Sequence, residues 1–324
     1  MTSTTYEPPA APESDLRRSG IRLGDLLFKG IAILAALAAT GLLGLIAWKV
    51  LDLAWPAIQN FGLSFIWTEA WDPVTQDFGA LIFIYGTVLT SLIALVIATP
   101  LSIAIALFLT EIAPRRLAAP IATMVELLAA IPSVVLGLWG ILVFGPWVRD
   151  HLEPWIQATP LGALPVFSGD PSQAGILPAA LVLTIMIIPI TSAICRELFI
   201  RVPQDLKDGA LALGSTRWEA IRGVVFTYTA PGIAAAVLLG LGRAFGEAIA
   251  VNQTIGNRNT IPTSWFEPGD SLGSKVASEY VGATSLQQAS SILYLAAILM
   301  VISLATNVVA QFIVVRFERA RRAV

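Results

Sequence analysis

Six long runs of apolar residues dominate the sequence, and they exclude most folds that have a water-facing surface. Each run is long enough, at about 1.5 Å per helical residue, to cross the ~30 Å hydrocarbon core of a bilayer. The runs cover residues 26–51, 79–110, 117–144, 174–194, 231–254 and 291–315. Composition agrees, because 56% of the residues are hydrophobic and 13% are charged, against about 25% charged in soluble domains. We therefore predict an all-α, polytopic membrane protein with six transmembrane helices.

The basic residues orient these spans. With the N-terminus inside, fifteen of the twenty Lys and Arg residues fall on the cytoplasmic side, as the positive-inside rule requires. The external connections keep Lys49, Arg149, Arg258 and Lys275, while Arg243 falls within the fifth run. Six spans then place both termini in the cytoplasm.

The domain organisation follows from this topology. We expect a disordered cytoplasmic tail over residues 1–25, a membrane domain over 26–316 and a basic cytoplasmic tail over 317–324. The fifth span is expected to begin at Pro231, a residue that suits the first turn of a helix. An irregular external cap is expected after the third span, where the chain contains Pro146, Pro154, Pro160, Pro165 and Pro171.

A charged stretch between the fourth and fifth runs, DLKDGALALGSTRWEAIR, has the pattern of a helix, a tight turn and a second helix. Gly214 is a helix stop, and Thr216 with Glu219 three residues later has the spacing of a capping box. We place this hairpin at residues 203–225, on the cytoplasmic surface, where another protein can use its exposed apolar face. The competing interpretation is a surface hairpin with no partner.

No G-x-x-x-x-G-K-[ST] phosphate loop occurs in the sequence. If ATP drives this protein, the nucleotide must therefore bind to another subunit, and the hairpin must transmit its movement. We expect no enzyme activity in this chain, no cofactor and no nucleic-acid partner. Because Cys195 is the only cysteine, an intrachain disulfide and a cysteine metal site are excluded.

A pair of charges lies inside the fifth run, Arg243 and Glu247, four residues apart and so on one helix face. Counted from Pro231, Arg243 is ~18 Å along the helix, where an arginine costs at least ~2.5 to 3.5 kcal/mol. A planar guanidinium suits a tetrahedral oxyanion, and Glu247 would hold it while the pathway is empty. The competing interpretation is an ion pair that only pins neighbouring helices. Glu126 and Ser133, in the third run, are further candidates for the pathway.

The hairpin resembles the coupling loop of ABC importer permeases, whose pattern is Glu-Ala-Ala, three residues and Gly. The positions that match are Asp208, Gly209, Ala210 and Gly214, with Asp-Gly in place of Glu-Ala. Together with the segments LALGSTRWEAI, ELLAAIPSVVLGLWG and GRAFGEAIAV, it is similar to the phosphate-specific ABC importer permeases of the PstC type. The resemblance covers residues 26–319, although Ala248 stands where that family usually has threonine.

The resemblance implies a type I ABC importer (MetI-like) permease fold in a bacterial inner membrane, which moves inorganic phosphate inward by alternating access. The residues expected to couple the chain to an ATPase are Asp208, Gly209, Ala210, Gly214, Arg217 and Glu219. The implied partners are a PstB-like ATPase dimer, a PstA-like paralogous permease and a periplasmic or lipid-anchored PstS-like phosphate-binding protein. Three alternatives stay open: a permease for molybdate or sulfate, a phosphate-sensing scaffold without flux, and a proton-driven transporter that uses Glu126 and Glu247.

Overall fold

The computed structural model describes residues 23–322, so most of the expected N-terminal tail, residues 1–22, lies outside the described part, as do residues 323–324. The chain divides into two units, residues 1–49 and 50–324. The described part of the first unit belongs to helix α1 (Leu23–Phe61), and its large apolar side chains are exposed, for example Leu34 at 69%. A helix that is apolar and exposed on all sides suits contact with lipid.

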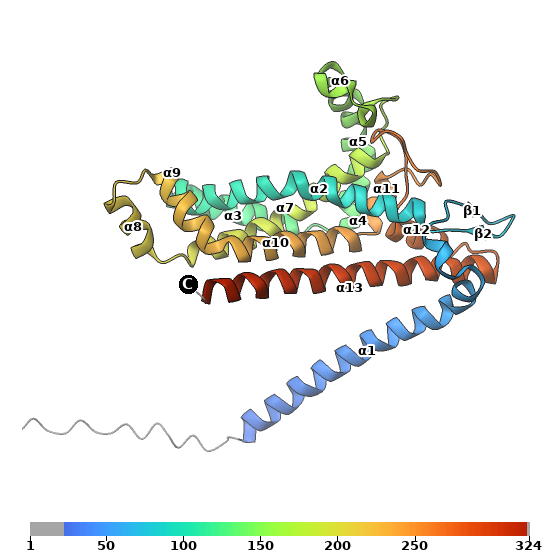
Figure 1. The fold of residues 1–324 in the computed structure, drawn as a ribbon, viewed down its shortest axis with the longest axis horizontal. Coiled ribbons are helices and arrows are strands. Elements are labelled where there is room, and N and C mark those ends of the chain that lie inside the picture. Colours follow the sequence, from blue (N-terminus) through green and yellow to red (C-terminus); the bar gives the residue numbers. More distant parts are fainter. Residues whose placement is uncertain (1–22, 323–324) are drawn as a thin grey trace, which may run out of the picture. The chain divides into compact units, whose positions relative to one another are not determined.

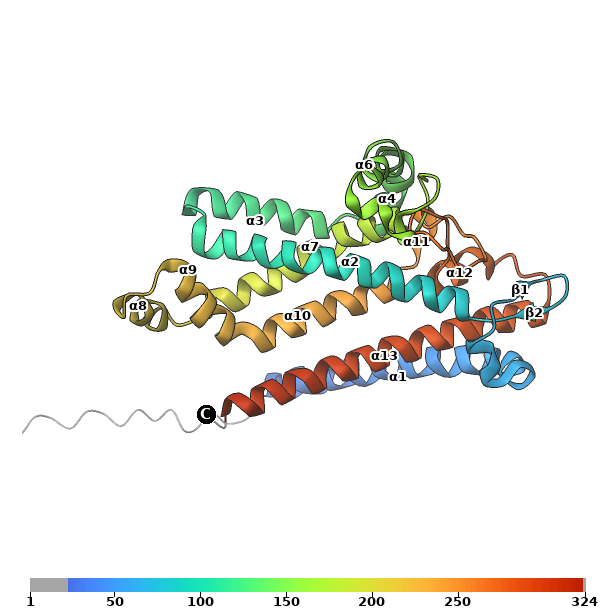
Figure 2. The same ribbon diagram turned by 45° about the horizontal axis from the view of Figure 1, so that its top comes forward.

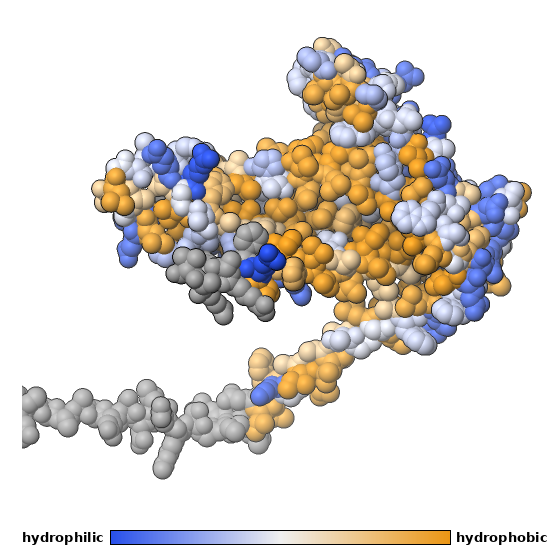
Figure 3. Space-filling model, in the orientation of Figure 1, coloured by the Kyte–Doolittle hydropathy of each residue, from blue (hydrophilic) through white to orange (hydrophobic). Residues whose placement is uncertain are grey.

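Among the described residues, six helical segments are long and apolar enough to cross a membrane, which confirms the predicted number. They comprise α1, α2 (Leu81–Leu107) with the π-helical turn η2 (Phe108–Ile112), the segment Ser133–Ala158, α7 (Ile176–Ile200), the segment Arg217–Gly246 that contains α10 (Phe226–Gly246), and α13 (Leu286–Arg322). In the second unit, hydrophobic residues cover the middle of the helices (Figure 3). Hydrophilic residues gather near α8 (Gln204–Ala212) and α9 (Arg217–Ala220), and near the strands β1 (Trp71–Asp72) and β2 (Asp77–Phe78).

The third predicted span is not one helix, so the prediction of a continuous 117–144 segment is wrong. Helix α3 (Arg115–Ala129) lies alongside α7 and ends before Pro132, and α4 (Ser133–Trp139) begins after it (Figure 2). Proline has no backbone N–H, and it disfavours the α conformation in the residue before it. Pro132 therefore divides the span in two.

The second piece continues much further than expected. It runs through η3 (Gly140–Phe144), α5 (Gly145–Trp147), η4 (Val148–Leu152) and α6 (Glu153–Ala158). Pro146 and Pro154 lie in the first turns of α5 and α6, where a missing N–H is tolerated. The irregular cap begins only after Ala158, with the 3-10 turns η5 (Pro160–Ala163) and η6 (Pro165–Phe167).

Helices α2, α7 and α10 lie side by side at the centre of the second unit, and α13 lies along α10 (Figure 1). Small buried residues, such as Ala94 and Ala98 of α2 and Ala179 of α7, let the helix backbones approach closely. Gly240 of α10 contributes in the same way, because a Cβ there would be 3.0 Å from Ile187 of α7. This close packing fixes the helix that carries Arg243.

The end of the second unit opposite α8 and α9 has small elements that the sequence did not predict (Figure 1). Strands β1 (Trp71–Asp72) and β2 (Asp77–Phe78) pair antiparallel, with Trp71 opposite Phe78. After α10 the chain forms α11 (Ile249–Thr254) and then α12 (Leu272–Glu279). Two strands of two residues each leave the all-α class unchanged.

Candidate functional site

The charged hairpin has the predicted helix, turn and helix. Helix α8 (Gln204–Ala212) ends before Gly214, whose φ of +88° is the left-handed conformation that favours glycine at this point of a helix. Helix α9 (Arg217–Ala220) starts at the predicted capping box, because the Thr216 hydroxyl accepts from the Glu219 N–H and the Glu219 carboxylate accepts from the Thr216 N–H.

The second arm of the hairpin is continuous with the fifth span. Helix α9 passes through the π-helical turn η7 (Ile221–Val225) directly into α10. The expected start of the span at Pro231 is wrong, because Pro231 lies inside α10. Membrane helices tolerate an internal proline, since neighbouring groups compensate for the lost hydrogen bond. A force on α9 would therefore act directly on the helix that carries Arg243.

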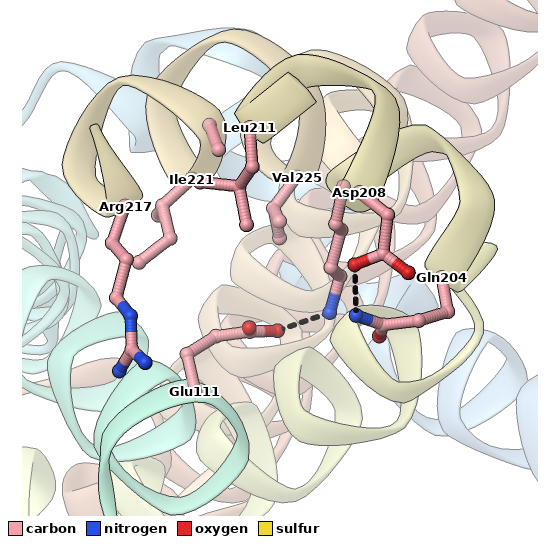
Figure 4. Close-up of a pocket in the computed structure, with 9 residues that line it drawn as sticks. Glu111, Gln204, Asp208, Leu211, Arg217, Ile221 and Val225 are labelled. Atoms are coloured by element: carbon pink, nitrogen blue, oxygen red, sulfur yellow. Dashed lines mark hydrogen bonds and ion pairs between the residues drawn. The ribbon is translucent and has the colours of Figure 1, made fainter. Parts of the chain in front are cut away.

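The hairpin encloses one side of a cleft of about 390 Å³ (Figure 4). On the other side, Glu111 of η2 forms an ion pair with Lys207 of α8, and both side chains are largely buried, at 16% and 15% exposed. Gln204 donates to Asp208 over 3.0 Å within α8. The Lys207–Glu111 pair therefore ties the hairpin to the end of the second span.

The residues predicted to contact an ATPase lie together on this hairpin. Asp208, Gly209, Gly214, Arg217 and Glu219 are exposed, and Ala210 is half-buried. A group of large apolar side chains on the same hairpin also faces solvent: Leu206, Leu211, Leu213 and Trp218. Exposed apolar residues rimmed by polar ones are typical of a protein-binding surface.

Arg243 lines a pocket of about 470 Å³ between three helices. The pocket also contains Ile190 of α7, Glu247 and Asn307 of α13. Ile190 is the fifteenth of the 25 residues of α7, so it is ~21 Å from the start of that helix and ~15 Å from its end. Arg243 therefore lies opposite the middle of a membrane-spanning helix.

Arg243 and Glu247 form an ion pair, but not as successive turns of one helix. Helix α10 ends at Gly246, and Glu247 has an extended conformation (φ −80°, ψ 108°) before α11 begins. The guanidinium Nη2 is 3.9 Å from the Glu247 Oε2, at the outer limit for a direct contact. The Arg243 side chain is 42% exposed and that of Glu247 is 10% exposed. The cation is thus loosely held and open to the pocket.

The other two pathway candidates do not line the Arg243 pocket. Glu126 of α3 pairs with Arg196 of α7 over 3.0 Å, across the contact between these two helices. Ser133 is the first residue of α4, after the break at Pro132. Sequence reasoning therefore identified two of the residues in the pocket, Arg243 and Glu247, but missed Asn307. An amide within a long apolar run is the signal that could have revealed it.

A second charged cluster is buried near α12, and the sequence did not predict it. Lys275, expected in an external loop, is only 2% exposed and contacts Asp270, Glu279 and Asn259. The Trp71 indole donates to Glu279 over 2.9 Å, and the Lys275 Nζ lies 5.2 Å from the centre of the Trp71 ring. Burial raises the pKa of Asp270, and the charge of Lys275 opposes this only in part.

Comparisons with known proteins agree with this architecture. The family model for the binding-protein-dependent transport system inner membrane component matches residues 98–323. The phosphate transport system permease protein PstC of Pasteurella multocida (strain Pm70) is 40% identical over 311 residues, which cover 95% of this chain and 97% of that protein. The PstC of Mesorhizobium japonicum is 42% identical over 300 residues, or 91% of each chain.

A solved structure shows the same fold. A chain in the crystal structure of a bacterial alginate ABC transporter, in complex with its alginate pentasaccharide-bound periplasmic protein, matches with a TM-score of 0.55. The two chains are 18% identical, and the match covers 93% of this chain and 98% of the other. Identity this low supports the fold alone, and it agrees with the expected all-α importer-permease fold.

Proposed function

The chain belongs to the family of binding-protein-dependent transport system inner membrane components, and we propose that it is the permease subunit of an ABC importer that moves inorganic phosphate into the cell. The two relatives named above are phosphate transport permeases, and this chain matches each of them over almost its whole length. The observation that carries the proposal is Arg243, whose side chain is 42% exposed in a pocket opposite the middle of α7, with its guanidinium 3.9 Å from a single carboxylate.

The chemistry of Arg243 fits a phosphate ion. A guanidinium presents planar N–H donors that can hold two oxygens of an oxyanion at once, and it stays charged at any physiological pH. Glu247 supports release of the anion, because its carboxylate can pair with the guanidinium again when the anion leaves. In this mechanism the ion pair opens when phosphate arrives and forms again after phosphate has moved on.

The hairpin couples this site to ATP hydrolysis on a partner. Its exposed apolar side chains and Asp208 contact the ATPase subunit, and closure of the ATPase dimer moves α9 and with it α10. Such movement of one rigid element against others is the usual basis of alternating access. The pore is completed by a second, related permease, and a phosphate-binding protein delivers the anion from the outside. Both termini then lie in the cytoplasm.

Uptake of radiolabelled phosphate by the importer assembled in vesicles tests the proposal. Arg243→Gln should keep the complex intact and ATP hydrolysis active but lower phosphate flux ~10- to 100-fold, because a charge-assisted hydrogen bond contributes ~1.5 to 3 kcal/mol. Arg196→Gln, in the Arg196–Glu126 ion pair near the end of α7, is the matched control. Equal flux in Arg243→Gln and wild type would refute the assignment. If sulfate or molybdate inhibited the uptake of labelled phosphate as strongly as unlabelled phosphate does, phosphate would not be the specific substrate.

A further inference from the structure

The Arg243 pocket continues as a groove between α10 and α13. The Arg243 pocket shares two lining residues, Leu239 and Asn307, with an adjoining pocket of about 370 Å³. The lining residues of this second pocket are Ala235, Leu239, Asn307, Ala310, Gln311 and Val315. None of the six is charged, and only Asn307 and Gln311 carry polar side chains.

The direction of the groove follows from its lining. On α10 the lining moves back from Arg243 to Ala235, and on α13 it moves forward from Asn307 to Val315. Both steps are eight residues, or ~12 Å of helix. The groove therefore leads from Arg243 toward the start of α10, which follows the coupling hairpin, and toward the end of α13.

Asn307 and Gln311 are one helical turn apart and face the same groove. Both side chains are exposed, and neither amide has a hydrogen-bond partner within residues 23–322. A free amide in hydrocarbon is unfavourable, because its donors and acceptor lose the hydrogen bonds that water would provide. Two such amides on one face of an apolar span indicate a polar environment there.

We propose that Asn307 and Gln311 form an amide track that passes the oxyanion from Arg243 toward the cytoplasm. This proposal rests on the proposed function, because it assumes that Arg243 binds the anion. Each neutral amide offers two N–H donors to phosphate oxygens without adding a charge. Such donors bind an anion more weakly than a guanidinium does, so the anion can move on. A row of weak sites beyond a strong one lets the anion leave.

Cysteine accessibility tests whether the track is open to water and anion. In a Cys195→Ala background, which removes the only native cysteine, Asn307→Cys and Gln311→Cys are made in the assembled importer. Val309→Cys is the matched control, since Val309 is 52% exposed and lies about 200° around the helix from Asn307. A negatively charged methanethiosulfonate reagent is added from the cytoplasmic side, with and without inorganic phosphate.

We expect labelling at positions 307 and 311, slowed by phosphate, and no labelling at position 309. Asn307→Leu should reduce phosphate uptake per ATP hydrolysed, whereas Val309→Leu should not. Absence of labelling at 307 and 311, or labelling that phosphate does not slow, would overturn the track. If the Asn307→Cys variant is unlabelled and Asn307→Leu loses the partner permease on purification, the amides instead hold the two permeases together, which also overturns it.

The same experiment separates this inference from the proposed function. If phosphate uptake requires Arg243 but the two introduced cysteines are not labelled, the anion binds at Arg243 and leaves by another route. If uptake does not require Arg243, the proposed pathway itself fails. Each result therefore refers to one of the two proposals.

Discussion

Two charged clusters in this protein differ in how their cations are held. Lys275 is 2% exposed and contacts two carboxylates, an amide oxygen and two aromatic rings. Arg243 is 42% exposed and has one carboxylate at 3.9 Å. A fully paired, dry cation cannot accept a new partner without a large cost, whereas a loosely paired cation that faces a pocket can. The comparison suggests that the first cluster supports the fold and the second serves transport.

The position of each cluster agrees with this difference. The Lys275 cluster connects Trp71 of β1, Phe83 of α2 and Glu279 of α12, which are far apart in the sequence. The Arg243–Glu247 pair connects only residues on either side of the end of α10. Loss of the first cluster should therefore loosen several elements at once, while loss of the second should leave the packing almost unchanged.

Substitution Lys275→Met should have the largest effect. It leaves Asp270 buried without a cation, and breaking a buried pair costs ~3 to 5 kcal/mol. Glu279, at 29% exposed, also loses its cation. We expect a large fall in the melting temperature of the purified protein in detergent, or loss of the assembled complex. Arg243→Met is the control, with a change within about 1 kcal/mol. Similar losses in both variants would remove the distinction between the clusters.

Substitution Glu247→Gln should alter transport rather than stability. Without its carboxylate, Arg243 holds the anion more firmly, and we expect KM for phosphate uptake and the maximal rate to fall together, each by up to ~10-fold for ~1.4 kcal/mol. Initial rates of uptake over a range of phosphate concentrations measure both. A higher KM with an unchanged maximal rate would contradict the release role of Glu247.

The Lys207–Glu111 pair is intermediate, because its two side chains are 15% and 16% exposed. We expect Lys207→Met to cost about 1 kcal/mol of stability, near the upper value for exposed pairs. Since this pair ties the hairpin to the second span, the variant should hydrolyse more ATP per phosphate moved. Arg201→Met, in the exposed Arg201–Glu197 pair, is the control. An unchanged ratio of ATP to phosphate would show that the pair does not affect coupling.

The pH dependence of Asp270 gives the smallest expected effect. Burial raises the pKa of Asp270 in the folded state, so the folded state still binds a proton when the unfolded state has lost it. Deprotonation of Asp270 therefore lowers the stability of the folded state as the pH rises from the ordinary pKa of an aspartate toward the raised pKa of the folded state. At higher pH this loss of stability remains. Asp270→Asn removes the titration. The stability of the variant minus that of wild type should thus be larger at about pH 7 than at about pH 4. A difference in melting temperature that does not change with pH would contradict this.

Much of the fold could be predicted from local pattern. The six apolar runs predicted six spans, and the Thr216–Glu219 spacing predicted the start of α9, because helix caps and apolar periodicity depend on residues within a few positions of one another. Pro132 was also visible in the sequence, but a proline in a membrane helix can bend the helix or end it. Only the structure showed that here it ends one helix and that another follows.

The sequence by itself determined the spans, the hairpin and the presence of a charge pair in the fifth run. Only the tertiary structure decided which charged side chains are fully paired with others and which are exposed to a pocket. Glu126 meets Arg196, 70 residues away, and Glu111 meets Lys207, 96 residues away. Lys275, which the sequence placed in an external loop, is buried because Trp71 and Phe83 pack over it. Such pairings depend on how distant helices pack, and no local pattern contains that information.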